Sequence, residues 1–160
     1  MLSEMALVRI LVDGYSLLHN WPELAPGQPR HSASAREALI RTLTRYQDVT
    51  GTPVTIFFDG SSSSRGPQNA ANHGQVEVLY SVAGQTADQM IERVAHRFAV
   101  YGEVLAVTDD HAERETVMSL GGMASSCLNF IQIVENTLAE QADELKNYNR
   151  LEQRRFRKGR

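Results

Sequence analysis

A chain of 160 residues, 42% hydrophobic and 22% charged, is long enough for one globular domain with a sizeable core. Its formal net charge of −3 gives no overall nucleic-acid signature, and its single cysteine excludes an internal disulfide. No apolar run has the length of a membrane span and the N-terminal residues lack signal-peptide features, so we expect a cytoplasmic protein without membrane contact.

The basic side chains gather at the end of the chain. We therefore expect one folded domain over residues 1–148 and a basic C-terminal tail over residues 149–160. Such a tail either contacts RNA or another polyanion, or is simply a solvated terminus. The sequence does not decide between these alternatives, and it leaves the oligomeric state open.

The first half of the chain begins with an apolar, β-branched segment, Ala6 to Val12, which predicts a buried strand. Tyr15 to Arg30 is rich in proline and glycine, so we expect mostly connection there. A helix capped by Ser32 or Ser34 follows and ends at Gly51. The next elements expected are a strand at Val54 to Phe58 and a long loop at residues 60–74.

The second half continues the alternation of strands and helices. Thr86 and Gln89 have the spacing of a capping box, which predicts the start of a helix. The other expected elements are strands at Gln75 to Ser81, Val104 to Thr108 and Met123 to Ser125, a short helix at Glu113 to Leu120, and a long helix capped by Ser126. This order predicts a three-layer α/β fold, in which a mostly parallel sheet of four to five strands has helices on both faces.

Aspartates stand just after the predicted strands. Asp13 and Asp59 each end a strand, Asp109 and Asp110 follow another, and Asp88 lies in the first turn of a helix. Each one alone is explained as a turn or helix cap. However, the carboxyl ends of parallel strands share one edge of the sheet, so we expect these side chains to meet there. Capping does not require every strand to bring a carboxylate to the same edge.

A cluster of carboxylates is the kind of ligand set that Mg²⁺ or Mn²⁺ uses. A divalent ion offsets the charge of a phosphodiester and lowers the pKa of water, which favours hydrolysis of such substrates. The sequence has no cysteine–histidine spacing typical of zinc, no Walker-type phosphate loop and no serine nucleophile elbow. The residues themselves therefore favour a metal-dependent phosphodiester hydrolase.

Five short motifs, in this order, resemble those of YacP-type NYN-domain proteins, which belong to the PIN-like ribonucleases. They are Asp13 to His19 with Trp21 to Leu24, Phe57 to Gly60, Thr86 to Glu92, Val107 to Asp110, and Gly121 to Ser126. The resemblance implies a PIN-like fold and an Mg²⁺- or Mn²⁺-dependent endoribonuclease acting on single-stranded or locally unpaired RNA. For some members it further implies messenger RNA as the substrate, in contact with the ribosome.

The resemblance also ranks the acidic residues. It implies that Asp13, Asp88 and Asp110 hold the metal and that Asp59 belongs to the catalytic set. Asp109 falls on the variable position beside Asp110. Separately, helical spacing sets Glu92 one turn after Asp88 on the same side, where it either supports the site or is an exposed residue without a role. For RNA contacts the candidates are Tyr15, His19, Arg30 and Arg65.

One position departs from the family pattern. Ser16 stands where the family usually has asparagine, and serine offers a single hydroxyl in place of an amide. This substitution motivates a second hypothesis, an RNA- or ribosome-binding module of the same fold with weakened or lost catalysis. A third hypothesis is a phosphohydrolase of small phosphate esters, because acidic sheet edges serve that chemistry as well.

Overall fold

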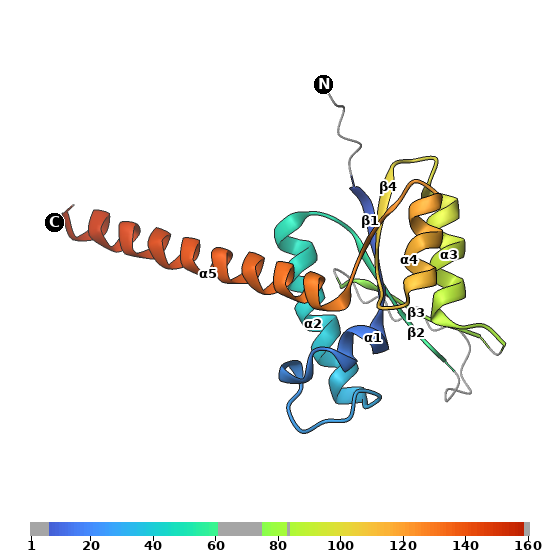
Figure 1. Cartoon of the computed structure of the whole chain (residues 1–160). Helices are drawn as coiled ribbons and strands as arrows, with labels where there is room; N and C mark the ends of the chain where they lie inside the picture. The colour runs from blue at the N-terminus through green and yellow to red at the C-terminus, as the bar shows by residue number, and fades with distance from the viewer. Residues whose placement is uncertain (1–6, 61–74, 83, 159–160) are drawn as a thin grey trace.

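A single parallel sheet forms the centre of the protein (Figure 1). The structure is a computed structural model that describes residues 7–60, 75–82 and 84–158. The sheet has five strands in the order β3-β2-β1-β4-β5, and every neighbouring pair is parallel. The strands are β1 (Leu7–Asp13), β2 (Val54–Phe58), β3 (Glu77–Tyr80), β4 (Glu103–Val107) and β5 (Met123–Ser125). The predicted α/β sheet is confirmed, including the short edge strand β5.

Strand β1 is the middle of the sheet because both of its edges are paired. Its residues Ile10, Leu11 and Val12 are almost completely buried, as expected for a strand covered on both faces. Asp13 lies opposite Phe57 of β2, and Val12 lies opposite Val107 of β4. The strands therefore end at nearly the same level, and the residues that follow them lie along one edge.

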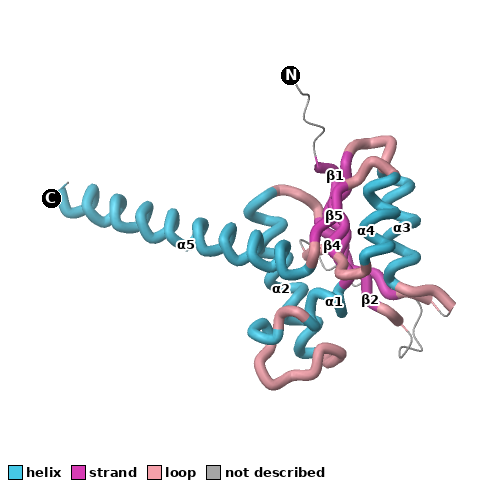
Figure 2. The backbone as a smooth tube through the Cα atoms, in the orientation of Figure 1, coloured by secondary structure: helices cyan, strands magenta, loops and turns pink. Residues whose placement is uncertain are grey.

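Helices cover both faces of the sheet, which confirms the three-layer arrangement (Figure 2). One face packs against α1 (Gly14–His19), α2 (Ala33–Thr50) and the first part of α5 (Cys127–Lys158). The other face packs against α3 (Ala87–Phe98) and α4 (His111–Ser119). Side chains alternate between these two cores along β1, since Ile10 and Val12 enter the first and Leu11 the second.

The caps expected from the sequence start two of these helices. The Ser32 hydroxyl accepts a hydrogen bond of 3.1 Å from the Ala35 amide at the start of α2. Thr86 and Gln89 form both hydrogen bonds of the capping box at the start of α3. Gly51 ends α2 with φ at 76°, a left-handed conformation that glycine adopts without strain.

The expectation of mostly connection from Tyr15 to Arg30 was wrong. This segment holds the short helix α1 and the 3-10 helix η1 (Pro22–Leu24). Helix α1 forms because the Asp13 side chain caps it and because Leu17 and Leu18 are buried in the core. Six residues carry too little periodicity for this burial to be foreseen from the sequence.

Helix α5 begins after Ser126, whose hydroxyl accepts a hydrogen bond from the Asn129 amide as predicted. The helix then leaves the domain and continues as a single helix (Figure 1). The basic segment that we separated as a tail, residues 149–160, is helical as far as Lys158 as part of α5. Among the described residues, no helix combines the length and the apolar character needed to cross a membrane.

Gly14 begins α1 in close contact with Phe58 of β2. A Cβ atom at residue 14 would lie 2.3 Å from the Phe58 ring. We expect Gly14→Ala to lower the free energy of unfolding by about 2 kcal/mol, because overpacking displaces the ring or α1. Denaturant unfolding measures this change. The control is the double variant with Phe58→Leu, which makes room for the methyl group and should recover part of the loss; additive losses would contradict the clash.

Candidate metal centre

Four carboxylates come together at the carboxyl edge of the sheet. Asp13 ends β1, Asp110 follows β4, Asp88 lies in the first turn of α3, and Glu113 lies in the first turn of α4. One carboxylate oxygen from each of Asp88, Asp110 and Glu113 lies within 4.8 Å of the other two. Asp13 adjoins the same group, since its carboxyl contacts that of Asp88. The structure thus brings together the three aspartates that we predicted as metal ligands.

Glu113 is the member of the group that the sequence analysis missed. It is 2% exposed, and neither of its carboxylate oxygens accepts a hydrogen bond from any described residue. Burial, contact with the Asp88 carboxyl and the charges of the other two aspartates together raise the pKa of Glu113 to about 10. Without a cation, this environment therefore favours the protonated form of the Glu113 side chain.

The sequence does hold a signal for Glu113, because it stands three residues after Asp110, which caps α4. A glutamate at that position usually reaches back to the amide of the capping residue. Here the Asp110 amide donates instead to the Thr108 hydroxyl, at 3.1 Å. Asp110 itself accepts from the Glu113 amide, also at 3.1 Å. With its usual partner occupied, the Glu113 side chain turns toward the acidic group.

Asp13 is held by Ser16. Its two oxygens accept one hydrogen bond from the Ser16 amide, at 3.3 Å, and one from the Ser16 hydroxyl, at 3.0 Å. Burial raises the pKa of Asp13 to about 6, the two hydrogen bonds from Ser16 act against this rise, and Asp88 adds to it. Ser16 therefore orients Asp13 and favours its ionised form.

Asp59 and Asp109 lie at the same edge but are engaged in holding helices. Asp59 accepts a hydrogen bond of 2.7 Å from the Ala87 amide, the first residue of α3. Asp109 accepts from the Cys127 amide at 3.0 Å and from the Asn20 side chain at 2.7 Å. Asp59 thus fixes the helix that carries Asp88, and Asp109 joins the start of α5 to the end of α1.

Glu92 is partly buried on α3, and it does not belong to the group of three mutually close carboxylates.

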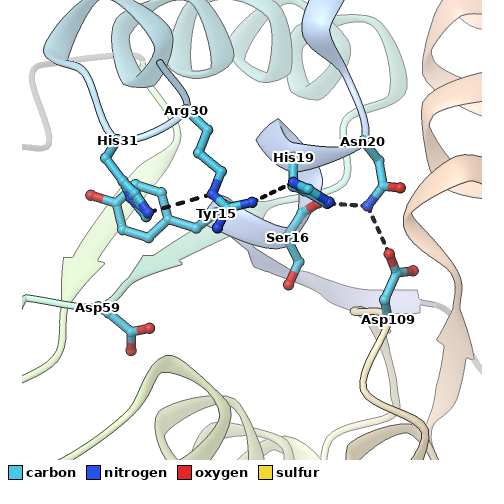
Figure 3. A pocket seen from close by; sticks show the side chains of 8 residues that line it. All are labelled: Tyr15, Ser16, His19, Asn20, Arg30, His31, Asp59 and Asp109. Carbon is cyan, nitrogen blue, oxygen red and sulfur yellow. Dashed lines mark hydrogen bonds between the residues drawn. The ribbon is translucent and has the colours of Figure 1, made fainter.

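A pocket of about 410 Å³ lies at the carboxyl edge of the sheet, where Asp59 and Asp109 line it (Figure 3). Three of the four residues that we predicted for RNA contact, Tyr15, His19 and Arg30, line it. Arg65 lies outside the described residues. The pocket also includes Ser16, Asn20, His31, Asp59 and Asp109. It therefore connects an aromatic and basic wall with the acidic edge of the sheet.

Packing orders the aromatic and basic wall of the pocket. The Tyr15 ring lies between His31 and Phe58, with centroid distances of 4.5 and 4.8 Å. Arg36 donates to the His31 carbonyl at 2.6 Å and lies 3.4 Å from the Tyr15 hydroxyl. Arg30 contacts the His19 ring. The wall carries aromatic side chains and the Arg30 guanidinium, which are groups that contact bases and phosphates.

Comparison with known proteins identifies the family. The YacP-like NYN domain matches residues 10–159 of the chain. This chain belongs to the YacP-like NYN domain family. It is 29% identical over 127 residues to the protein named YacP of Bacillus subtilis, across 79% of this chain and 74% of that protein.

Two solved structures of Bacillus subtilis Rae1 (YacP) share the fold. One, a point mutant, has a TM-score of 0.73 and 27% identity, and the match covers 88% of this chain and 82% of that one. The other has a TM-score of 0.70 and 25% identity, with 89% and 81% covered. Membership in this family, within the PIN-like nucleases, supports a ribonuclease-type function for the chain.

The donor set fits a hard divalent cation. Three carboxylates converge within reach of one ion, and the buried Glu113 has two oxygens without a hydrogen-bond donor among the described residues. Oxygen ligands of this kind suit Mg²⁺ and Mn²⁺. A bound cation would also reverse the effects that raise the pKa of Glu113, because it favours the ionised carboxylate.

We predict that Glu113→Gln stabilises the metal-free protein. Because the pKa of Glu113 is raised on folding, the contribution of this residue to the free energy of unfolding is most favourable below about pH 4.5. That contribution is lost as the pH rises toward 10. Glutamine removes that loss, so at pH 7 the free energy of unfolding should rise by about 1 kcal/mol or more, and the gain should shrink toward pH 4.5.

Denaturant unfolding at several pH values measures this gain, and thermal unfolding with and without Mn²⁺ measures the cation's effect. Mn²⁺ should stabilise the wild type more than the variant, because the variant lacks one ligand. The matched control is Glu115→Gln, which removes an exposed carboxylate from the same helix. Equal effects of the two substitutions would contradict a special role for Glu113.

Proposed function

We propose that the protein is an Mg²⁺- or Mn²⁺-dependent endoribonuclease. The observation that carries this proposal is the convergence of Asp13, Asp88, Asp110 and the buried Glu113 at one edge of the sheet. Carboxylates that lie close together repel one another when ionised, so they destabilise the fold unless some are protonated or a cation is bound. Membership in the family supports a nuclease, and the acidic group is a candidate site for a divalent metal ion.

In this proposal Asp13, Asp88 and Asp110 hold the cation, and Glu113 completes their set. When bound, the ion would supply charge neutralisation at the phosphodiester and a lower pKa for the attacking water. Ser16 orients Asp13 through its hydroxyl and amide. Asp59 acts as a positioning residue, because it fixes the first turn of α3 beside the group.

The pocket wall supports RNA as the substrate. A strand of RNA passing the acidic edge can place a base beside the Tyr15 and His31 rings and phosphates near Arg30 and His19. A small phosphate ester needs only the acidic edge and gives no reason for this aromatic and basic wall. The family resemblance further favours messenger RNA in a ribosome-associated context as the natural substrate.

The first test is cleavage of labelled single-stranded RNA by the full chain with Mn²⁺ or Mg²⁺. We expect Asp88→Asn to reduce cleavage by about a hundredfold or more, because Asp88 contacts both Asp13 and Glu113, and chelation by EDTA to abolish it. The control Asp48→Asn removes an exposed carboxylate from α2 and should leave the rate unchanged. Cleavage that survives EDTA and Asp88→Asn would refute the proposed mechanism.

The hypothesis of a binding module without catalysis rests on Ser16. The structure gives this serine the task of holding Asp13, with a hydrogen bond to each carboxylate oxygen. This arrangement favours an active enzyme over a module that has lost its chemistry. It also predicts that the hydroxyl at residue 16 is needed for activity.

We therefore expect Ser16→Ala to lower kcat by roughly 10–100-fold while RNA binding persists, because Asp13 loses a hydrogen bond that orients it. Ser16→Asn introduces an amide that both donates and accepts hydrogen bonds, so this variant should keep at least a substantial part of the wild-type rate. Single-turnover cleavage and equilibrium RNA binding separate the two effects. If only Ser16→Asn cleaves RNA, the natural chain is the binding module.

A further inference from the structure

A second pocket, of about 240 Å³, adjoins the pocket beside Tyr15. His19 and Arg30 line both pockets, so these two side chains form the wall between them. Asp59 and Asp109 line the first pocket only, and none of the residues that line the second pocket is acidic. The second pocket therefore continues the first in the direction away from the acidic edge of the sheet.

The buried part of the second pocket's lining is apolar. Leu18, Trp21 and Ala35 line it, and each is at most 5% exposed. The Trp21 indole Nε1 donates to the Glu135 carboxylate at 3.3 Å, so the ring is fixed and its only polar atom already has a partner. The interior of the second pocket thus offers apolar surface to a ligand.

The exposed part of the lining includes Gln28, which a tight turn holds in place. The Gln28 amide donates to the Ala25 carbonyl at 3.1 Å, and Pro26 and Gly27 stand between them. Gly27 has φ at 77°, the conformation that the third residue of a type II turn requires. The Gln28 side chain, which both donates and accepts hydrogen bonds, is therefore presented from a fixed backbone beside Arg30.

Arg30 is held between the two pockets by histidines. Its Nε donates to the His31 ring at 3.4 Å, and its Nη1 contacts the His19 ring (Figure 3). A guanidinium has more N–H donors than these two contacts use, so Arg30 can also donate to a phosphate. A phosphate bound there would lie between the first pocket and the second.

We propose that the second pocket binds one base of an RNA strand, while the neighbouring base of the strand lies beside Tyr15 and the phosphate between them contacts Arg30. This inference rests on the proposed function, because it takes RNA as the substrate. The flat base covers the apolar lining, and the Gln28 amide contacts the polar edge of the base. The second pocket thereby makes cleavage depend on the identity of the base at one position of the strand.

A base explains the second pocket better than an apolar side chain of a partner protein does. An apolar side chain would cover Leu18 and Trp21 but would use neither Gln28 nor Arg30. A nucleotide uses all four residues, because its base is flat with a polar edge and its phosphate is anionic. The shared wall of the two pockets also matches a strand, which supplies a base and a phosphate at every step.

Trp21 is the only tryptophan of the chain, so its fluorescence reports on the second pocket. The test titrates the full chain, carrying Asp88→Asn so that RNA stays intact, with a single-stranded oligoribonucleotide in the presence of Mg²⁺. A ribose-phosphate chain of the same length without bases is titrated in parallel. We expect RNA to change the Trp21 emission in a saturable way and the abasic chain to leave it nearly unchanged.

In the same background, Ala25→Leu adds bulk to the lining of the second pocket. It should suppress the change in Trp21 emission and weaken RNA binding roughly tenfold, as expected for the loss of contacts to one base. The matched control is Ala139→Leu, which adds the same side chain at an exposed position of α5 and should bind RNA like the background chain. Circular dichroism and thermal unfolding establish that each variant is folded.

A second measurement uses cleavage of RNAs randomised around the cleaved bond by the chain with Asp88 intact. We expect a base preference at one position that Gln28→Ala weakens, with preferences at other positions unchanged, because only the contact to that base is lost. A preference that Gln28→Ala leaves intact would overturn the role of Gln28 in reading the base.

The outcomes separate this inference from the proposed function. If RNA is cleaved but leaves the Trp21 emission unchanged, or if Ala25→Leu binds RNA as tightly as its control, the base pocket is overturned and the nuclease stands. An equal response to the abasic chain, or no binding of RNA, also overturns the base pocket. If RNA changes the emission and Ala25→Leu suppresses the change, but RNA is never cleaved with Mg²⁺ or Mn²⁺, the base pocket stands and the proposed nuclease fails.

Discussion

The carboxylates at the edge of the sheet hold the helices in place, and this arrangement governs both the fold and the site. Asp13 caps α1 and Asp110 caps α4, while Asp59 and Asp109 accept from the first amides of α3 and α5. Because all the strands are parallel, these helix starts lie at one edge. Their amides and dipoles stabilise negative charge, and so allow several carboxylates to remain close together.

Asp109 and Asp110 differ in how many of their carboxylate oxygens are used in hydrogen bonds that hold the fold. Asp109 uses both oxygens in hydrogen bonds to other parts of the fold, so its contribution is structural. Asp110 uses one oxygen in its cap, and its carboxylate still lies within reach of Asp88 and Glu113. A helix cap and a cation ligand are therefore compatible roles for one side chain. The sequence allows each aspartate to be explained as a turn or helix cap or as a metal ligand, and one residue can have both roles.

Glu113 and Asp88 are the pair that the caps do not satisfy. Burial raises the pKa of Glu113, and contact with the Asp88 carboxyl raises it further, because ionisation of both groups inside the protein is unfavourable. A fold selected for stability alone would replace this glutamate with an apolar or amide side chain. Its burial in the first turn of α4, with two carboxylate oxygens that accept no hydrogen bond from the described residues, is the physical reason to regard the edge as a candidate cation site.

The strands, the caps of α2, α3 and α5, and the edge on which Asp13, Asp88 and Asp110 meet could all be predicted from the order of the amino acids. These features follow from apolar periodicity, cap spacing and the direction of parallel strands, which are local or topological rules. The formation of α1 and the inward turn of Glu113, by contrast, depend on contacts that exist only in the folded protein. Helix α1 depends on the burial of Leu17 and Leu18. The orientation of Glu113 depends on the hydrogen bond that the Asp110 amide donates to the Thr108 hydroxyl. Neither contact follows from a recurring spacing of residues in the sequence.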